Sequence, residues 1–216
     1  DRLPEAVKLT AKVASVIGRV FGQDLLLQAH PMRPAADHLA EELATLLARD
    51  FAKLESPTPR LTYIFKHNIT QEVIYQTLLT DQRQEVHLGV ATALEANQPE
   101  RVEDLANHYY NCNLEERRLR GKALHYLDAA GQRARHDYAN ETALRYFSQA
   151  LGIETRTPWL KAKIEILHIL GRRDEERAGL TMLAAVAEND ESEVALLQGS
   201  YYEAVSDYSA AQSHIK

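Results

Sequence analysis

The chain has 216 residues, of which 45% are hydrophobic and 26% are charged, a composition typical of a globular protein. Its net charge of −6 disfavours DNA or an acidic membrane surface as the main partner. No apolar run approaches the roughly 20 residues that a membrane-spanning helix needs. A single cysteine, Cys112, cannot form an internal disulfide, so we expect a cytoplasmic protein in a reducing compartment.

Residues 1–68 are predicted to form a winged-helix-like module. Apolar residues at helical spacing predict helices over 4–17, 21–29 and 35–52. The cluster Ser56-Pro57-Thr58-Pro59 predicts a turn, and the β-formers of Leu61–Phe65 predict the one strand that the pattern supports. Three helices followed by a turn and a strand are typical of a winged helix.

The rest of the chain is predicted to be helical, which makes the fold mainly α. Connecting helices are expected over 69–114, and an α-solenoid of tetratricopeptide-like helical hairpins over 115–216. The expected helices cover 70–79, 81–96, 101–113, 116–136, 138–152, 158–170, 174–189, 191–204 and 207 onward. The first residue is Asp1 and a helical pattern continues to the last, so we expect a C-terminally truncated piece of a larger protein.

Small and large residues recur near the 34-residue period of tetratricopeptide repeats. Gly131 precedes Ala143-x₃-Phe147-x₂-Ala150, Ala178-x₃-Met182-x₂-Ala185 follows, and then come Gly199, Tyr202 and Ala211. Gly131 and Gly199 are separated by 68 residues, as are Ala143 and Ala211, which is twice the period. Because small residues let paired helices approach closely, these residues are predicted to pack the repeats. The alternative is a series of unrelated hairpins, and Ile166 replaces the expected glycine of a degenerate middle repeat.

Motifs for catalysis or metal binding are weak. The phosphate-binding and nucleophile-elbow motifs are absent from the sequence, so neither nucleotide hydrolysis nor serine hydrolysis is supported. Asp37-His38 with Glu41-Glu42, and His108 with Cys112, have the i,i+4 spacing of metal ligands. Each pair offers two ligands where a structural zinc needs four, so we prefer a solvated face and a half-buried pair, and predict no metal site.

DNA binding by the winged helix is also disfavoured. The third helix would enter the major groove, where Arg and Lys contact phosphates. This helix instead carries Asp37, Glu41, Glu42 and Asp50 against Arg49. We therefore expect a packing or regulatory module and no nucleic-acid partner for this segment.

A histidine lies where the predicted strand meets the next helix. Asn68 or Thr70 is expected to cap that helix, and Asn68-x-x-Gln71 resembles a capping box. His67 would then lie beside a helix N-terminus, which favours anions, and Lys66 adds positive charge. Such a histidine can donate to a phosphate oxygen. From the residues alone, however, a histidine that satisfies a neighbouring carbonyl is the favoured interpretation.

Several blocks together resemble a known family. They are VASVIGRVF, TYIFKHNITQEVIYQTLL, LANHYY and YLDAAGQRARHDYANETALRYFSQAL, within residues 10–152. The sequence resembles the region that follows the ATPase core in STAND-type signalling ATPases. More narrowly, it resembles bacterial proteins in which an AAA-like ATPase, a winged helix and tetratricopeptide repeats accompany a class III adenylate or guanylate cyclase or a protein kinase domain.

The resemblance implies a nucleotide switch in the parent protein. In related proteins the winged helix folds onto the nucleotide domain in the ADP-bound state, and a histidine near its end contacts the ADP phosphate. This implies nucleotide sensing by His67, with Lys66 beside it. The repeats would bind a protein or peptide partner and release the lock, while the segment itself binds no cofactor and catalyses nothing. A segment of an ATPase–repeat transcription regulator and a free-standing repeat scaffold are the alternatives.

Overall fold

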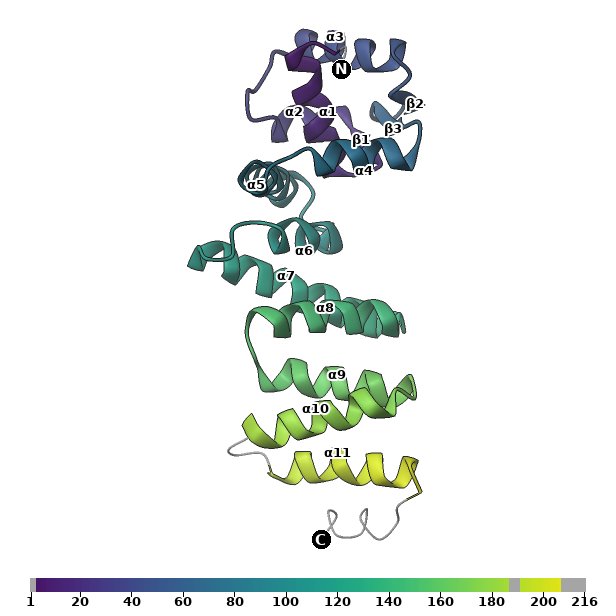
Figure 1. Cartoon of the computed structure of the whole chain (residues 1–216), viewed down its shortest axis with the longest axis vertical. Helices are drawn as coiled ribbons and strands as arrows, with labels where there is room; N and C mark the ends of the chain where they lie inside the picture. Colours follow the sequence, from purple (N-terminus) through teal and green to yellow (C-terminus); the bar gives the residue numbers. More distant parts are fainter. Residues whose placement is uncertain (1–2, 187–190, 207–216) are drawn as a thin grey trace. The chain divides into compact units, whose positions relative to one another are not determined.

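The computed structural model describes residues 3–186 and 191–206 (Figure 1). Within this part the chain is mainly α-helical, with eleven helices and a small three-stranded antiparallel sheet near the N-terminus. Contacts divide the chain into an N-terminal unit, Asp1–Ala123, and a C-terminal unit, Leu124–Lys216. The predicted domains 1–68, 69–114 and 115–216 are not tested by this division and stay predictions.

The N-terminal unit alternates helices with short strands and then continues with helices alone. Its elements in chain order are α1 (Glu5–Ile17), β1 (Val20–Gly22), α2 (Gln23–Ala29), α3 (Ala36–Ala48), β2 (Ala52–Ser56), β3 (Thr62–Phe65), α4 (Asn68–Gln76), α5 (Thr80–Asn97), α6 (Val102–Tyr110) and the first part of α7 (Arg117–His136).

β3 is the central strand of the sheet. It pairs antiparallel with β1 on one side and β2 on the other. Tyr63 and Phe65 of β3 are buried, and Phe21 of β1 joins them. The ring centroid of Phe21 lies 5.8 Å from that of Tyr63 and 5.2 Å from that of Phe65. These aromatic contacts favour the observed register, because a slip by one residue would turn the rings to the other face.

α1 packs against α2, α3, α4 and α5 and so provides much of the core of the N-terminal unit. Val7, Ala11 and Ala14 lie four and three residues apart on its buried face. The helix ends at Gly18, whose φ of 140° is one that a side chain rarely permits. The Gly18 N–H donates to the Ala14 carbonyl at 3.1 Å, and the chain then turns into β1.

The sequence predicts one strand in this region, whereas the structure has three. β1 uses residues assigned to the second helix, which begins at Gln23 and not at Phe21. The third helix ends at Ala48, four residues early, because the chain turns at Asp50 with a left-handed φ of 67° and enters β2. Both edge strands form because they pair with β3. Local sequence propensity cannot predict such contacts between distant residues.

α5 lies close to α2 because Gly89 has no side chain. A Cβ at this position would lie 2.9 Å from the carbonyl oxygen of Ala29, closer than real Cβ atoms approach. α5 also packs against α6. The Tyr109 hydroxyl of α6 donates to Glu95 Oε2 of α5 at 2.7 Å. The two helices are thus joined by a polar contact as well as by buried apolar residues.

The C-terminal unit consists of the end of α7 followed by four helices. They are α8 (Asn140–Ile153), α9 (Thr157–Ile169), α10 (Arg173–Val186) and α11 (Glu191–Ala204). α8 packs against α9, α9 against α10 and α10 against α11, and α11 also contacts α9. Figure 1 shows α8 to α11 as successive layers of the unit. Buried apolar residues fill the space between α9, α10 and α11, namely Leu160, Ile164, Leu180, Leu183 and Val194.

Two glycines set the closest helix approaches in this unit. A Cβ on Gly131 of α7 would lie 2.8 Å from Cζ of Phe147 in α8. A Cβ on Gly179 of α10 would lie 2.9 Å from Cγ1 of Ile164 in α9. In both pairs a bulky side chain occupies the space that the glycine leaves empty. The predicted helix from residue 207, with Ala211, lies outside the described residues.

Two glycines of α7 allow a matched stability test. Gly131→Ala forces a methyl group into the buried Phe147 ring, and we expect a loss of about 1–3 kcal/mol from overpacking. Gly121→Ala meets nothing within 4 Å and should stabilise the same helix by about 0.5–1 kcal/mol. Urea denaturation of both variants measures the difference, and equal effects would contradict the close contact.

Candidate functional site

His67 lies between β3 and α4, where the sequence predicts that a strand meets a helix. It is the N-cap residue of α4, its backbone is extended, and its side chain is exposed. Its carbonyl oxygen accepts a hydrogen bond from the Thr70 N–H at 3.0 Å. The imidazole therefore lies next to the first turn of a helix, where unpaired N–H groups attract anions. Its predicted contact with a nucleotide stays a prediction.

The predicted cap of this helix is wrong. Asn68 is the first helical residue, and neither a side-chain cap nor a capping box occurs at the N-terminus of α4. Gln71, the expected partner in the box, instead donates from Nε2 to the Ser15 carbonyl oxygen at 2.6 Å. The Gln71 side chain, which the local sequence predicts to cap α4, therefore forms a tertiary contact with α1 instead.

Lys66 is engaged on the other side of the junction. Its ammonium group forms an ion pair with the Asp50 carboxylate. The hydrogen bond from Lys66, followed by its charge, lowers the pKa of Asp50. The backbone N–H of Lys66 also donates to the Phe51 carbonyl at 3.0 Å. Lys66 therefore ties the turn before β2 to the end of β3, so its predicted role beside His67 would have to compete with Asp50.

Four of the predicted repeat-packing residues lie in the interior of the C-terminal unit. Ala143, Phe147 and Ala150 of α8 have no exposed surface, and Gly131 of α7 is buried against Phe147. Their arrangement matches the close helix contact that small residues permit. Whether they belong to a tetratricopeptide repeat stays a prediction.

The predicted packing residues of α10 do not lie on its buried face. Ala178 and Ala185 are exposed, and Met182 between them is 51% exposed. Gly179 and Leu183 are buried in their place. Gly199 is buried in α11 and Tyr202 is half-buried. Ala211 lies outside the described residues.

A buried carboxylate supports the turn between α9 and α10. Glu176 is 1% exposed, and its Oε1 lies 2.7 Å from Nδ1 of His168. Its Oε2 accepts a hydrogen bond from Arg173 Nη1 at 2.6 Å. Because a buried carboxylate needs charged or hydrogen-bonding partners, this cluster is an internal support of the hairpin.

Two histidines, His87 and His108, are in contact inside the N-terminal unit. Only His108 was identified as a candidate from the sequence. His87 Nδ1 lies 2.9 Å from His108 Nδ1, and His87 Nε2 lies 3.1 Å from the Tyr75 hydroxyl. Both imidazoles are 2% exposed. His87 shares the i, i+3 and i+7 spacing of Val90 and Leu94, which are fully buried. That spacing could have placed His87 in the core.

Burial keeps this cluster neutral and unreactive. Desolvation lowers the pKa of His87 to about 3, and the charges of His108 and Arg83 add to the effect. Desolvation and Arg101 lower the pKa of His108 to about 4. Burial raises the pKa of Cys112 to about 12, and its thiol donates to the His108 carbonyl at 3.3 Å. A protonated thiol is a poor nucleophile and a poor metal ligand.

The two candidate metal pairs remain separate. Asp37, His38 and Glu41 are exposed on α3, whereas His108 of α6 and Cys112, just after that helix, are buried. Among the described residues no group of three or more His, Cys, Asp or Glu side chains could hold a metal ion. Nor does any described helix combine the length and apolar character needed to cross a membrane.

Comparison of the chain with protein-family models, with curated proteins and with solved structures found no match.

The histidine pair predicts acid-sensitive folding. Between about pH 6.5 and pH 4 the unfolded chain binds protons that folded His87 and His108 exclude, so stability falls as the pH falls. The loss approaches about 1.4 kcal/mol per pH unit for each histidine. Urea denaturation across this range measures it.

The variant His87→Gln/His108→Gln should flatten the pH dependence, because neither glutamine titrates. His38→Gln, which changes an exposed histidine of the same unit, serves as the control and should leave the slope unchanged. A double variant with the slope of the original chain would show that other groups cause it.

Proposed function

We propose that this chain is a regulatory and protein-interaction segment of a STAND-type signalling ATPase. In this proposal the N-terminal unit contains a winged helix that packs against the neighbouring ATPase domain of the same protein. The C-terminal unit contains tetratricopeptide-like hairpins that bind a protein or peptide. Binding there is coupled to an ATP/ADP switch and to a cyclase or kinase output elsewhere in the parent protein.

The order of elements supports the winged helix. Helix, strand, two helices and a β-hairpin follow one another as α1, β1, α2, α3, β2 and β3. The first strand completes the sheet by pairing with β3, which gives the order β1-β3-β2. A winged helix is expected to combine three helices with such a sheet. Residues 57–61 connect β2 to β3 and are the proposed wing.

The observation that carries the proposal is the packing of each helix on the next in the C-terminal unit. Helices that cannot bury an apolar face alone gain a continuous core when they stack in sequence. Gly131 against Phe147 and Gly179 against Ile164 supply close contacts in two successive helix pairs. The exposed face of α10, with Ala178, Met182 and Ala185, is then solvent-facing surface and not the repeat contact.

The place of His67 supports a role in nucleotide sensing. Its side chain is exposed at the N-terminus of α4, so a neighbouring domain can reach it. A phosphate there would meet both the imidazole and the positive end of the helix dipole. Because Lys66 is held by Asp50, His67 is the stronger candidate of the two.

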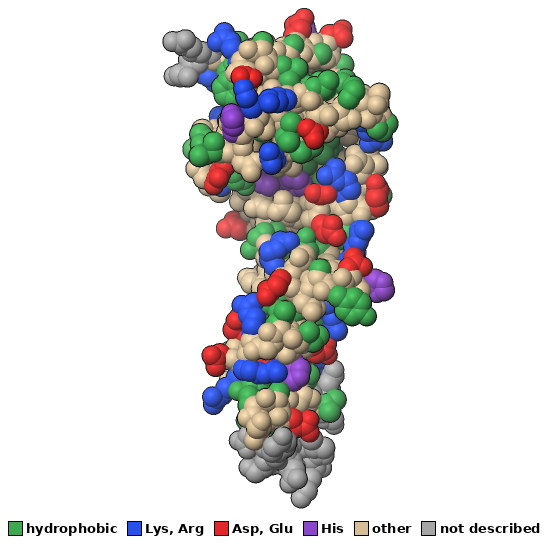
Figure 2. All heavy atoms as spheres, turned by 90° about the vertical axis from the view of Figure 1, so that its right-hand side faces the viewer, with side chains coloured by type: hydrophobic (Ala, Val, Ile, Leu, Met, Phe, Trp, Pro, Cys, Tyr) green, Lys and Arg blue, Asp and Glu red, His purple; other side chains and the backbone are tan. Residues whose placement is uncertain are grey.

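The surface charges favour a protein partner over nucleic acid. Asp37 and Glu41 are exposed on α3, the helix that would otherwise enter a DNA groove. Figure 2 shows acidic and basic side chains interspersed over each unit on the face that it draws. A polyanion is attracted by a concentrated basic surface, and α3 does not supply one. No catalytic role is proposed for the segment itself.

The experiment uses the full-length parent protein with His67→Ala. We expect faster loss of bound ADP and a higher basal output, because a contact that stabilises the inactive state is removed. Nucleotide retention during gel filtration and output activity are the measurements. His38→Ala, at another exposed histidine of the N-terminal unit, is the matched control.

Unchanged ADP retention and output in the His67→Ala protein would refute the sensing role. Equal changes in the His38→Ala protein would show that the effect is not specific to the start of α4.

A further inference from the structure

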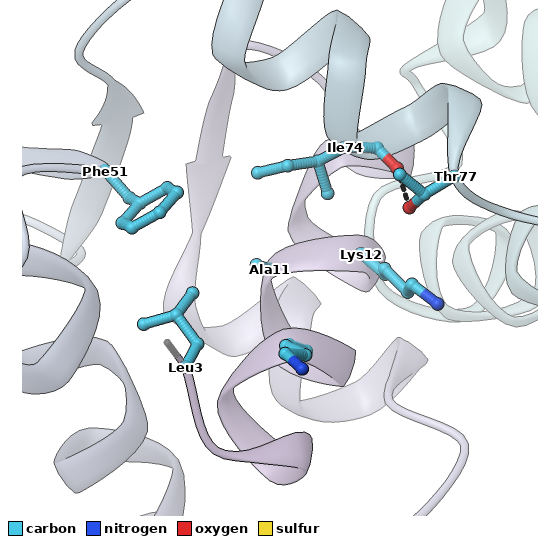
Figure 3. A pocket seen from close by; sticks show the side chains of 7 residues that line it. Leu3, Ala11, Lys12, Phe51, Ile74 and Thr77 are labelled. Carbon is cyan, nitrogen blue, oxygen red and sulfur yellow. Dashed lines mark hydrogen bonds between the residues drawn. The ribbon is translucent and has the colours of Figure 1, made fainter. Parts of the chain in front are cut away.

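A hollow in the N-terminal unit lies between α1, α4 and the start of β2. Its volume is about 360 Å³, and it is lined by Leu3, Lys8, Ala11, Lys12, Phe51, Ile74 and Thr77. Figure 3 shows Leu3, Phe51 and Ile74 around the space, with Ala11 at its floor and Lys12 at one edge. The hollow is separate from His67 and from the buried histidine pair.

The walls are apolar side chains that folding leaves incompletely covered. Leu3, Phe51 and Ile74 are each half-buried, and only Ala11 is fully enclosed. α4, which carries Ile74, has no buried residue at all. Apolar surface of this kind is stabilised when a ligand removes it from water.

One edge of the hollow is basic. Lys8 and Lys12 are four residues apart in α1 and so share one helix face. Lys8 donates to the exposed Glu5 carboxylate at 2.8 Å, whereas Lys12 makes no ion pair with any residue that the structure describes. No carboxylate contributes to the lining of this hollow. Glu5, which lies outside the lining, pairs with Lys8 and is also influenced by the charge of Lys12. Lys12 is therefore the lysine that an anionic group in the hollow would meet.

We propose that this hollow binds a small amphiphilic anion with an alkyl body and a carboxylate head. The alkyl chain packs between Leu3, Phe51 and Ile74, and the carboxylate lies toward Lys12. The volume is at the lower end of the roughly 300–1,000 Å³ of small-molecule sites. The proposed site is independent of the proposed signalling function.

The ligand is taken from solution and not from a membrane. The chain carries a net charge of −6, which opposes approach to an anionic bilayer. A hollow of about 360 Å³ also suits one short alkyl chain, whereas a two-chain lipid would leave most of its apolar surface exposed.

The test is a titration of the 216-residue chain with octanoate, followed by amide NMR. We expect saturable shifts at residues around the hollow in α1 and α4. Octanol, which lacks the charge, should bind more weakly, and octyltrimethylammonium, which reverses the charge, should bind most weakly. Phosphatidylglycerol vesicles in a sedimentation assay should leave the protein in the supernatant.

Two variants locate the ligand. Lys12→Gln should weaken octanoate binding about two- to fivefold, the effect of one exposed ion pair, and leave octanol binding unchanged. Thr77→Phe, at an exposed position on the rim, should fill the hollow and abolish both. Lys53→Gln changes an exposed lysine of β2 outside the hollow and is the control.

Several results would overturn the proposal. They are an absence of saturable shifts, equal binding of the cationic and anionic amphiphiles, or full octanoate binding by Thr77→Phe with an unchanged circular dichroism melt. Sedimentation of the protein with vesicles would assign the site to a membrane lipid instead.

Discussion

The contact between Gly131 and the ring of Phe147 is the constraint on which the C-terminal unit depends most. It brings α7 and α8 so close that a single added methyl group would overlap the ring. The same device recurs where Gly179 of α10 meets Ile164 of α9. A further glycine, Gly89, serves the contact of α5 with α2 in the N-terminal unit. In each case a missing side chain determines how two helices pack.

This mode of packing leaves distinct inner and outer faces on each helix. In α10 the inner face holds Gly179, Leu183 and the supported carboxylate of Glu176, while Ala178 and Met182 face water. Stacked helices with a fixed interior can vary their exposed faces without loss of the core, and the proposed binding of a partner would use those faces. In the N-terminal unit, the ion pair between Lys66 and Asp50 lies next to His67, the N-cap residue of α4.

Much of the helical fold follows from the sequence, but contacts between distant residues do not. The stripe of Val7, Ala11 and Ala14 predicted α1, because its spacing alone places one face in the core. β1 and β2 were missed because they need β3 as a partner. The buried face of α10 was predicted wrongly because Ala178 and Gly179 are both small. A repeat period of about 34 residues cannot decide which of two adjacent small residues faces the neighbouring helix. The sequence position of Gln71 fitted a helix cap, but its side chain forms a hydrogen bond with the Ser15 carbonyl oxygen. The contact of His87 with His108 joins two different helices and could not be predicted from the local sequence.

The most direct test of the close helix contact is a double-mutant cycle between Gly131→Ala and Phe147→Leu. The smaller leucine leaves room for the added methyl group, so Gly131→Ala should cost less stability in that background. We predict a coupling free energy of at least about 0.5 kcal/mol in this direction, measured by urea denaturation. Additive effects of the two changes would mean that Gly131 and Phe147 do not touch, and would contradict the account of how these helices pack.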